Sequence, residues 1–156
     1  MKKQTRWLSV MGGIILGCFI INWQQRCIEQ WKVQANKNRG MFMLMNQWVN
    51  VKQDGKSLKD YFLKNNYKKI AVYGMGDIGK RLAKELKNSD VEVVYGIDQN
   101  KDIRYSDIQI VSVSDHLANV DAVVVTVLDK FYEISDVLAK KIHCPVLAIE
   151  DILNEI

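Results

Sequence analysis

Short apolar runs alternate with amphipathic stretches through the second half of the chain. Apolar runs bounded by polar or glycine-rich segments predict β-strands. Such runs occur at residues 69–73 (KIAVY), 91–97 (VEVVYGI), 108–111, 122–127 (AVVVTV) and 145–149 (PVLAI). We therefore expect about five strands, with Pro145 at the start of the last one, where a missing N–H is tolerated.

The segments between these runs carry apolar side chains at helical spacing. Residues 77–86 follow one helical face, and a second helix is expected to begin at Asp129. Ser114 is a candidate cap for a further short helix, and residues 151–156 are expected to form a terminal helical turn. Because strands joined by helices form parallel units, the pattern predicts an α/β fold with a small doubly wound parallel sheet and helices on both faces.

The segment 24–66 is predicted to be a helical connector, with Gly40 as the expected break. One helical face of this segment would carry Met41, Leu44, Met45, Trp48 and Val49. That face is expected to pack on its own domain, and a partner surface is the alternative. Residues 57–60 resemble a capping box that opens a short helix, which residues 65–66 are expected to end.

An uncharged run precedes the connector. Residues 7–23 (WLSVMGGIILGCFIINW) would span about 25 Å as a helix, at the short end of the membrane-crossing range. Tryptophans stand at both ends, and Lys2, Lys3 and Arg6 precede the run, as is typical of a bilayer segment. The sequence predicts residues 1–23 as a single-pass membrane anchor that contacts lipid through residues 7–23. Basic residues on both sides leave its orientation open.

Two other interpretations of this run stay open. Leu16-Gly17-Cys18 faintly resembles a lipoprotein cleavage site. The run could also lie in the membrane interface, although it has no properly polar face. Ser9, Gly13 and Gly17 recur every fourth residue, so two helices could approach closely there. This spacing predicts a homodimer contact, and the general abundance of small residues in membrane helices is the alternative.

The segment YGMGDIG, residues 73–79, joins the first predicted strand to the first predicted helix. Its glycines match G-x-G-x-x-G, in which Gly74 permits a tight exit, Gly76 lets a diphosphate approach the backbone and Gly79 lets the helix pack closely. N–H groups at the helix start favour an anion. The expected ligand contacts are Gly74, Met75, Gly76, Asp77, Ile78 and Gly79. The alternative is that these glycines serve only the turn and the packing.

Further candidate residues follow the other strands. Asp98 ends the second strand, close to the separation expected for a carboxylate that binds ribose hydroxyls, although it could merely cap a loop. Thr126 and Glu150 follow later strands, at the sheet edge where such folds bind ligands. Lys101 and Arg104 could meet a phosphate, or could be ordinary solvated charges. The glycine loop and Asp98 together are typical of a site for a ribose and a diphosphate, the groups that the cofactor NAD(P) carries.

Side chains for bond-making chemistry are scarce. No serine or cysteine has a partner that the pattern places beside it, and His116 and His143 are expected to be surface or packing residues. No cluster suggests a metal. The three cysteines have neither disulfide-like nor metal-like spacing, which favours a reducing, cytoplasmic compartment for the globular domain. The net charge of +4 comes from lysines scattered among acidic residues, which argues against a nucleic-acid partner. Enzymatic activity is left uncertain, and a binding role is favoured.

The chain from Lys68 to about Leu153 resembles the Rossmann-type nucleotide-binding modules of bacterial polysaccharide-biosynthesis proteins. These are the front domains of sugar acyltransferases and of membrane-bound sugar-phosphate transferases and dehydratases. The matching elements are the pattern I-x-x-Y-G-x-G-x-x-G from Ile70, the strand that ends in GID at Asp98, and the closing PVLAIEDIL. The resemblance implies a Rossmann-like nucleotide-binding domain over residues 67–156. It assigns Gly74, Gly76, Gly79 and Asp98 to a nucleotide or nucleotide-sugar site.

In those proteins a catalytic domain follows the module, and none follows it in this sequence, so the resemblance implies binding without their reactions. The expected function is that of a membrane-tethered module that binds a nucleotide, dinucleotide or nucleotide-sugar and assists a glycan-assembly enzyme. One alternative is a ligand-free protein-interaction module. Another is a small NAD(P)-dependent oxidoreductase, for which no catalytic residues are visible.

Overall fold

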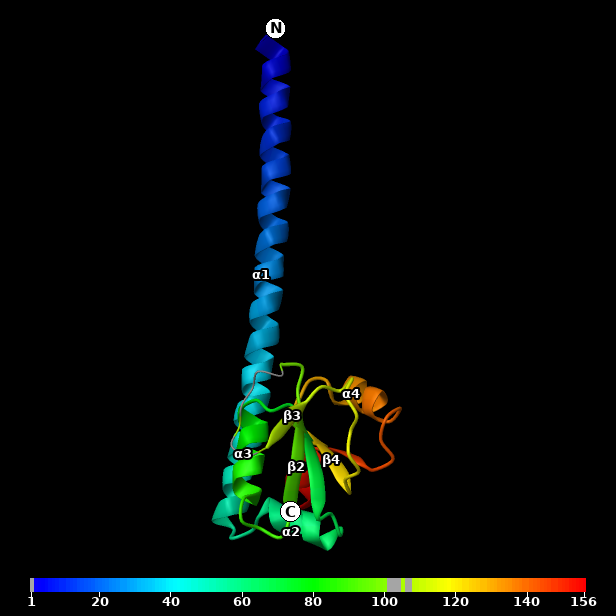
Figure 1. The fold of residues 1–156 in the computed structure, drawn as a ribbon. Helices are drawn as coiled ribbons and strands as arrows, with labels where there is room; N and C mark the ends of the chain where they lie inside the picture. Colours follow the sequence, from blue (N-terminus) through cyan, green and yellow to red (C-terminus); the bar gives the residue numbers. More distant parts are fainter. Residues whose placement is uncertain (1, 101–104, 106–107) are drawn as a thin grey trace. The chain divides into compact units, whose positions relative to one another are not determined.

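The computed structural model describes residues 2–100, 105 and 108–156, with side chains from Phe19 onward. The chain divides into two compact units, Met1–Gly40 and Met41–Ile156. Figure 1 shows the fold, coloured along the sequence from blue at the N-terminus to red at the C-terminus. Helix α1 (Lys2–Gln53) supplies the first unit and contributes its last turns to the second.

Helix α1 passes through Gly40 without the break that the sequence predicted, so that prediction was wrong. A glycine inside a helix costs only about 1 kcal/mol relative to alanine, and the turns after it are held by packing. Leu44 and Trp48 are buried in the core, and Met45 packs against it. The predicted apolar face therefore packs mainly on its own domain, although Val49 stays half exposed.

The predicted membrane anchor falls largely outside the side-chain description, because this begins at Phe19. The candidate dimer residues Ser9, Gly13 and Gly17 lie outside it as well. In the described part of the chain, no helix combines the length and the apolar character that crossing a bilayer requires. The anchor and the dimer contact stay predictions.

Five parallel strands form one sheet, which confirms the predicted α/β class and strand number. In chain order they are β1 (Lys69–Tyr73), β2 (Glu92–Ile97), β3 (Gln109–Val111), β4 (Ala122–Val125) and β5 (Val146–Ala148). In space the order is β3-β2-β1-β4-β5, and every neighbouring pair is parallel. The chain first extends the sheet to one side of β1 and then to the other, so the direction reverses beside β1.

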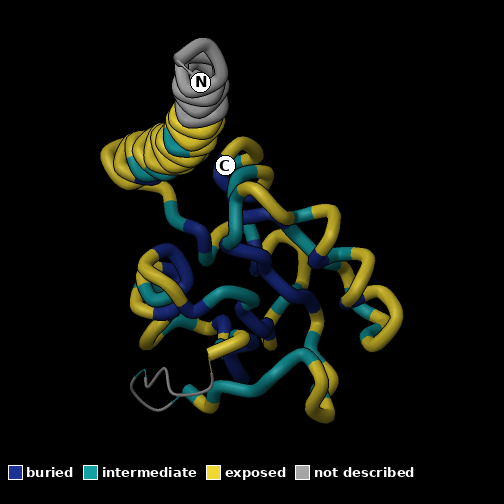
Figure 2. Tube along the Cα trace, turned by 90° about the horizontal axis from the view of Figure 1, so that it is seen from above, coloured by how far each residue is buried: buried dark blue, intermediate teal, exposed yellow. Residues whose placement is uncertain are grey.

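Helices cover both faces of the sheet. Besides α1 they are α2 (Leu58–Lys64), α3 (Asp77–Leu86), α4 (Phe131–Leu138) and α5 (Ile149–Glu155). Because successive strand residues point to opposite faces, Ile70 and Val72 pack in a cluster with α1, α2, α3 and α5. Ala71 packs in a second cluster with α4. Figure 2 shows these buried segments in dark blue, surrounded by exposed loops.

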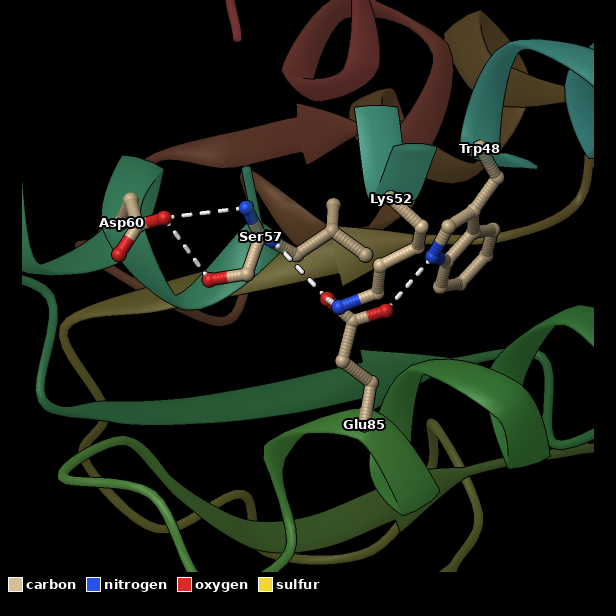
Figure 3. A network of polar contacts seen from close by, with 6 residues as sticks. Trp48, Lys52, Ser57, Asp60 and Glu85 are labelled. Carbon is tan, nitrogen blue, oxygen red and sulfur yellow. Dashed lines mark hydrogen bonds and ion pairs between the residues drawn. The ribbon is translucent and has the colours of Figure 1, made fainter. Parts of the chain in front are cut away.

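A polar junction at the end of α3 joins three helices (Figure 3). The Glu85 carboxylate accepts a hydrogen bond from Trp48 Nε1 at 2.6 Å and one from the Leu58 backbone N–H at 3.0 Å. It also pairs with Lys52. Since Trp48 and Lys52 belong to α1 and Leu58 opens α2, one carboxylate holds both helices against α3.

Local hydrogen bonds test two predictions about where helices begin. Asp60 accepts hydrogen bonds from the N–H and the hydroxyl of Ser57, so the predicted cap of α2 is confirmed. The helix predicted after Ser114 was wrong, because residues 112–120 form turns and irregular chain. There Asp115 accepts a hydrogen bond from the Ser112 N–H at 2.8 Å, and this local bond favours a turn over a helix.

Candidate functional site

The glycine loop, residues 74–76, leaves the carboxyl end of β1, which lies between β2 and β4. In open α/β sheets, the crevice at such a reversal of strand order is where ligands bind. Helix α3 begins immediately after the loop, with Gly76 as its N-cap. The fold therefore brings the loop close to Asp98 at the end of β2 and to Thr126 at the end of β4.

Gly74 has a backbone conformation that requires glycine. Its φ is +92°, and a Cβ at this position would lie 2.8 Å from Val127 Cγ2 and 2.9 Å from Thr126 Oγ1. Its N–H donates to the carbonyl oxygen of Ile97 at 2.8 Å. Conformation and crowding both exclude a side chain, so Gly74 lets the chain turn sharply between the ends of β2 and β4.

Gly76 and Gly79 stand in different surroundings. A Cβ on Gly79 would lie 2.2 Å from the carbonyl oxygen of Gly74, so only glycine lets α3 approach the loop so closely. A Cβ on Gly76 would meet nothing within 4 Å. The φ of Gly76 is −73°, which any residue adopts. Neither backbone strain nor crowding within the described chain requires a glycine at position 76.

Met75 fastens the loop to the sheet. Its side chain is fully buried, and a Cβ on Gly96 of β2 would lie 2.5 Å from Met75 Cγ. The absence of a side chain at Gly96 therefore makes room for Met75. The Met75 N–H donates to Asp98 Oδ2 at 2.8 Å. A ligand can thus reach Met75 only through its backbone.

Asp98 is half-buried and bonded to the backbone on both sides. Oδ2 accepts from the Met75 N–H, and Oδ1 accepts from the Asn100 N–H at 3.0 Å. Burial raises the pKa of the neighbouring Tyr73 phenol, and the negative charge of Asp98 raises it further. Tyr73 is therefore a protonated hydrogen-bond donor at neutral pH. Each Asp98 oxygen keeps a second lone pair for another donor.

Thr126 is buried, and its hydroxyl lies 2.6 Å from the Gly74 carbonyl oxygen and 3.1 Å from that of Tyr73. Its N–H also donates to Tyr73. A hydroxyl has one hydrogen to donate, and the loop carbonyl takes it. Thr126 therefore ties β4 to the glycine loop and can offer a ligand only an acceptor.

Asp77 and Ile78 open α3 on opposite sides. Ile78 is buried in the core, whereas Asp77 is exposed in the first turn, where its charge favours the helix dipole. The first N–H groups of any α-helix lack partners inside that helix. Ile78 can therefore contribute only its backbone N–H to a ligand.

The other candidates are not gathered at the loop. Glu150 follows β5, which β4 separates from β1, about 10 Å away at normal strand spacing. Burial raises the pKa of Glu150, and the charge of Asp151 raises it further. Lys101 and Arg104 lie outside the described residues. His116 and His143 are exposed, and the described side chains contain no group of acidic, histidine or cysteine residues that could hold a metal.

The sequence pattern did not identify two residues that contact or adjoin the glycine loop, Gly96 and Tyr73. Gly96 had a signal, because a glycine inside a strand often marks a close approach of another group. Tyr73 belongs to the first predicted strand and to the resemblance pattern, but neither marks it as a ligand contact. Its position beside Asp98 follows from the pairing of Tyr73 with Ile97, which strand register alone decides.

A protein-family model described as "C2185-like, N-terminal" matches residues 66–145, just over half of the 156-residue chain. The matched segment contains β1 to β4, the glycine loop, Asp98 and Thr126. No curated protein and no solved structure matches the chain.

Proposed function

The chain belongs to the C2185-like N-terminal family, and we propose that residues 67–156 are a Rossmann-like module that binds a nucleotide, dinucleotide or nucleotide-sugar. The observation that carries the proposal is the contrast among the three glycines. Chain geometry requires Gly74 and Gly79, whereas a side chain at Gly76 would meet only open space. A ligand that approaches the backbone at Gly76 explains why that position lacks a side chain.

The neighbouring groups suit a diphosphate joined to a ribose. A diphosphate at Gly76 would meet the first N–H groups of α3 and the positive end of its dipole. Asp98 lies beside the loop, bonded to the Met75 N–H, and its remaining lone pairs can accept from ribose hydroxyls. The Tyr73 phenol adds a donor at the same edge. Because a carboxylate repels a 2′-phosphate, we expect NAD to bind more tightly than NADP.

The module is proposed to bind its ligand without transforming it. Three ionisable side chains of the described chain adjoin the loop in sequence or by contact, namely Tyr73, Asp77 and Asp98. The raised pKa keeps Tyr73 protonated at neutral pH, so its phenol is not available as a base, and the Asp98 carboxylate is engaged by the Met75 and Asn100 N–H groups and, in the proposal, by the ribose hydroxyls. An oxidoreductase remains the competing activity, and turnover of a hydride donor by the purified chain would promote it.

Calorimetric titration of the full chain with NAD, NADP and UDP-sugars tests the proposal. The decisive variant is Gly76→Val, because no atom of the chain lies within 4 Å of a Cβ at this position, whereas the valine side chain would occupy the space of a diphosphate. We expect at least a tenfold loss of affinity with nearly unchanged thermal unfolding. Asp90→Asn, an exposed acid at the opposite end of β2, should bind like the parent chain.

Saturable binding that Gly76→Val abolishes supports the proposal. The compound that binds with the highest affinity then identifies the class of ligand. If no nucleotide saturates the chain, the proposal fails. If Gly76→Val binds as well as the parent chain, the ligand lies elsewhere and the glycine loop is only structural.

A ligand-free interaction module is the second candidate. The observation in its favour is that the loop satisfies its own polar groups, since the Met75 N–H binds Asp98 and the Gly74 carbonyl binds Thr126. A ligand must then be accommodated by groups that already have partners. Failure of every titration, together with retained folding, would favour this candidate.

We also propose that residues 7–23 tether the module to a membrane, with the module on the cytoplasmic side, and that it assists a glycan-assembly enzyme. The tether is supported by the uncharged run flanked by tryptophans, and the glycan role by the resemblance to polysaccharide-biosynthesis modules. Carbonate extraction should leave the full chain in membranes and release a chain that lacks residues 1–23. Labelling of Cys27 by an impermeant thiol reagent in intact cells then reports the orientation.

A further inference from the structure

Large apolar side chains of the first unit are exposed, with no other part of the described chain covering them. On α1, Ile21, Ile28 and Trp31 are 56%, 52% and 75% exposed. These residues precede Met41 and belong to the Met1–Gly40 unit. Side chains of this size gain about 1.5–3 kcal/mol each when they are buried. A repeated row of them along one helix marks a surface that another molecule covers.

The spacing of this row indicates what kind of molecule packs against it. Ile21, Ile28 and Ala35 recur every seven residues, and each is followed three residues later by Gln24, Trp31 and Asn38 respectively. These are the a and d positions of a heptad, which stay aligned only when two helices supercoil around each other. Farther along the sequence, Phe42 and Val49 continue the seven-residue spacing.

We propose that residues Ile21 to Asn38, the heptad segment, form a parallel, in-register coiled coil with a second copy of this chain. At about 1.5 Å per residue, the contact would run for about 27 Å. β-Branched isoleucine at a positions favours two parallel helices. In register, Asn38 meets Asn38 and Gln24 meets Gln24 of the second copy, so these amides find partners instead of being buried without one.

The charges select the direction of the second helix. Lys32 and Arg39 occupy e positions, and Cys27 and Gln34 occupy g positions. In a parallel pair, e positions face g positions, so each basic side chain meets an uncharged partner. In an antiparallel pair, e faces e, which brings Lys32 and Arg39 against like charges. The parallel arrangement is therefore favoured.

A lipid surface fits this segment less well. A helix that lies in a membrane interface presents one broad apolar face. In the heptad segment the exposed Trp23 and Val33 lie outside the seam, at c and f positions that polar residues such as Gln34 and Asn36 separate from it. Gln24 and Asn38 interrupt the seam itself. Polar amides at seam positions serve to set register between helices. The observations thus favour a second copy over a bilayer.

Cysteine cross-linking of the full chain in detergent micelles tests the proposal. In a background with Cys18, Cys27 and Cys144 replaced by serine, Ala35→Cys puts a thiol in the seam. Val33→Cys puts one at an f position on the outer side of the same helix. We expect disulfide-linked dimers to form at least tenfold faster from Ala35→Cys.

A charge in the seam supplies the second measurement. Ile28→Asp added to the Ala35→Cys chain should slow cross-linking at least tenfold, whereas Asn36→Asp, at an outer b position, should leave it unchanged. Circular dichroism checks that each variant keeps its helix. Equal cross-linking at positions 35 and 33, or a monomeric mass by light scattering, overturns the proposal. A chain without residues 1–23 that is monomeric in micelles and still binds vesicles would show that the row faces lipid, and would overturn it equally.

Discussion

The start and the end of α3 differ in the groups that surround them. At its start, backbone atoms and glycines meet Asp98 and Thr126, and the space beyond Gly76 is open. At its end, the Glu85 carboxylate is enclosed by Trp48, Lys52 and Leu58. Bulk is excluded from the first end and supplied at the second. This difference is the basis for our proposal that a ligand approaches the first end, whereas the contacts at the second end hold α1 and α2 against α3.

Gly79→Ala should have the largest effect, because it adds bulk where the helix touches the loop. The new Cβ would lie 2.2 Å from the Gly74 carbonyl oxygen, so backbone must move. We expect the free energy of unfolding to fall by about 3 kcal/mol, measured by urea denaturation. Lys80→Ala, one residue along the same helix, is the control and should stay within about 0.5 kcal/mol of the parent chain. An unchanged midpoint for Gly79→Ala would show that the close packing at this end is not required.

Glu85→Ala breaks the other end of α3. Trp48 Nε1 and the Leu58 N–H would lose their acceptor, which we expect to cost about 2 kcal/mol of stability. Lys52→Met should cost less than about 1 kcal/mol, because that side chain is 44% exposed and its ion pair is screened. Thermal unfolding measures both. If Lys52→Met costs as much as Glu85→Ala, the ion pair and not the two N–H bonds holds the junction.

Thr126→Val tests the tie between β4 and the glycine loop. Valine keeps the shape but loses the bond to the Gly74 carbonyl, so we expect a loss of about 1 kcal/mol. Nucleotide affinity should fall a few-fold as the loop loosens. Thr126→Ser retains the hydroxyl and should restore the affinity. A stability loss in Thr126→Ser equal to that in Thr126→Val would assign the effect to packing.

Gly76→Ala should have the smallest effect on stability. Its φ suits alanine, which lowers the entropy of the unfolded chain, but alanine is a poorer N-cap than glycine. These opposed terms should leave the free energy of unfolding within about 0.5 kcal/mol of the parent value. A larger loss in chemical denaturation would mean that the chain itself needs this glycine, and the contrast with Gly79 would disappear.

The sequence predicted the residues that meet at the start of α3 better than those that meet at its end. The G-x-G-x-x-G pattern and Asp98 lie within one strand-helix-strand unit, so local spacing was enough to place them on neighbouring elements. Glu85 gave no comparable signal. Its partners Trp48 and Leu58 come from other helices, and nothing in a helical repeat says which charged residue such helices will enclose.

The two wrong predictions, a break at Gly40 and a helix after Ser114, have the same origin. A break at Gly40 follows from intrinsic helix propensity, which is worth about 1 kcal/mol, and the burial of Leu44 and Trp48 outweighs it. The helix expected after Ser114 follows from a capping signal, but Asp115 uses its carboxylate in a turn with Ser112. Local preferences of this size are decided by the packing and the hydrogen bonds around them.

The sequence by itself determined the five strands and the glycine loop after the first of them, because periodicity and glycine spacing act over neighbouring residues. Only the tertiary structure decided what the loop residues do. Met75 is buried against Gly96, and Asp98 binds the Met75 N–H. Thr126 holds the Gly74 carbonyl from β4. These contacts depend on the order and register of strands that are distant in sequence, and those are settled only when the whole sheet packs.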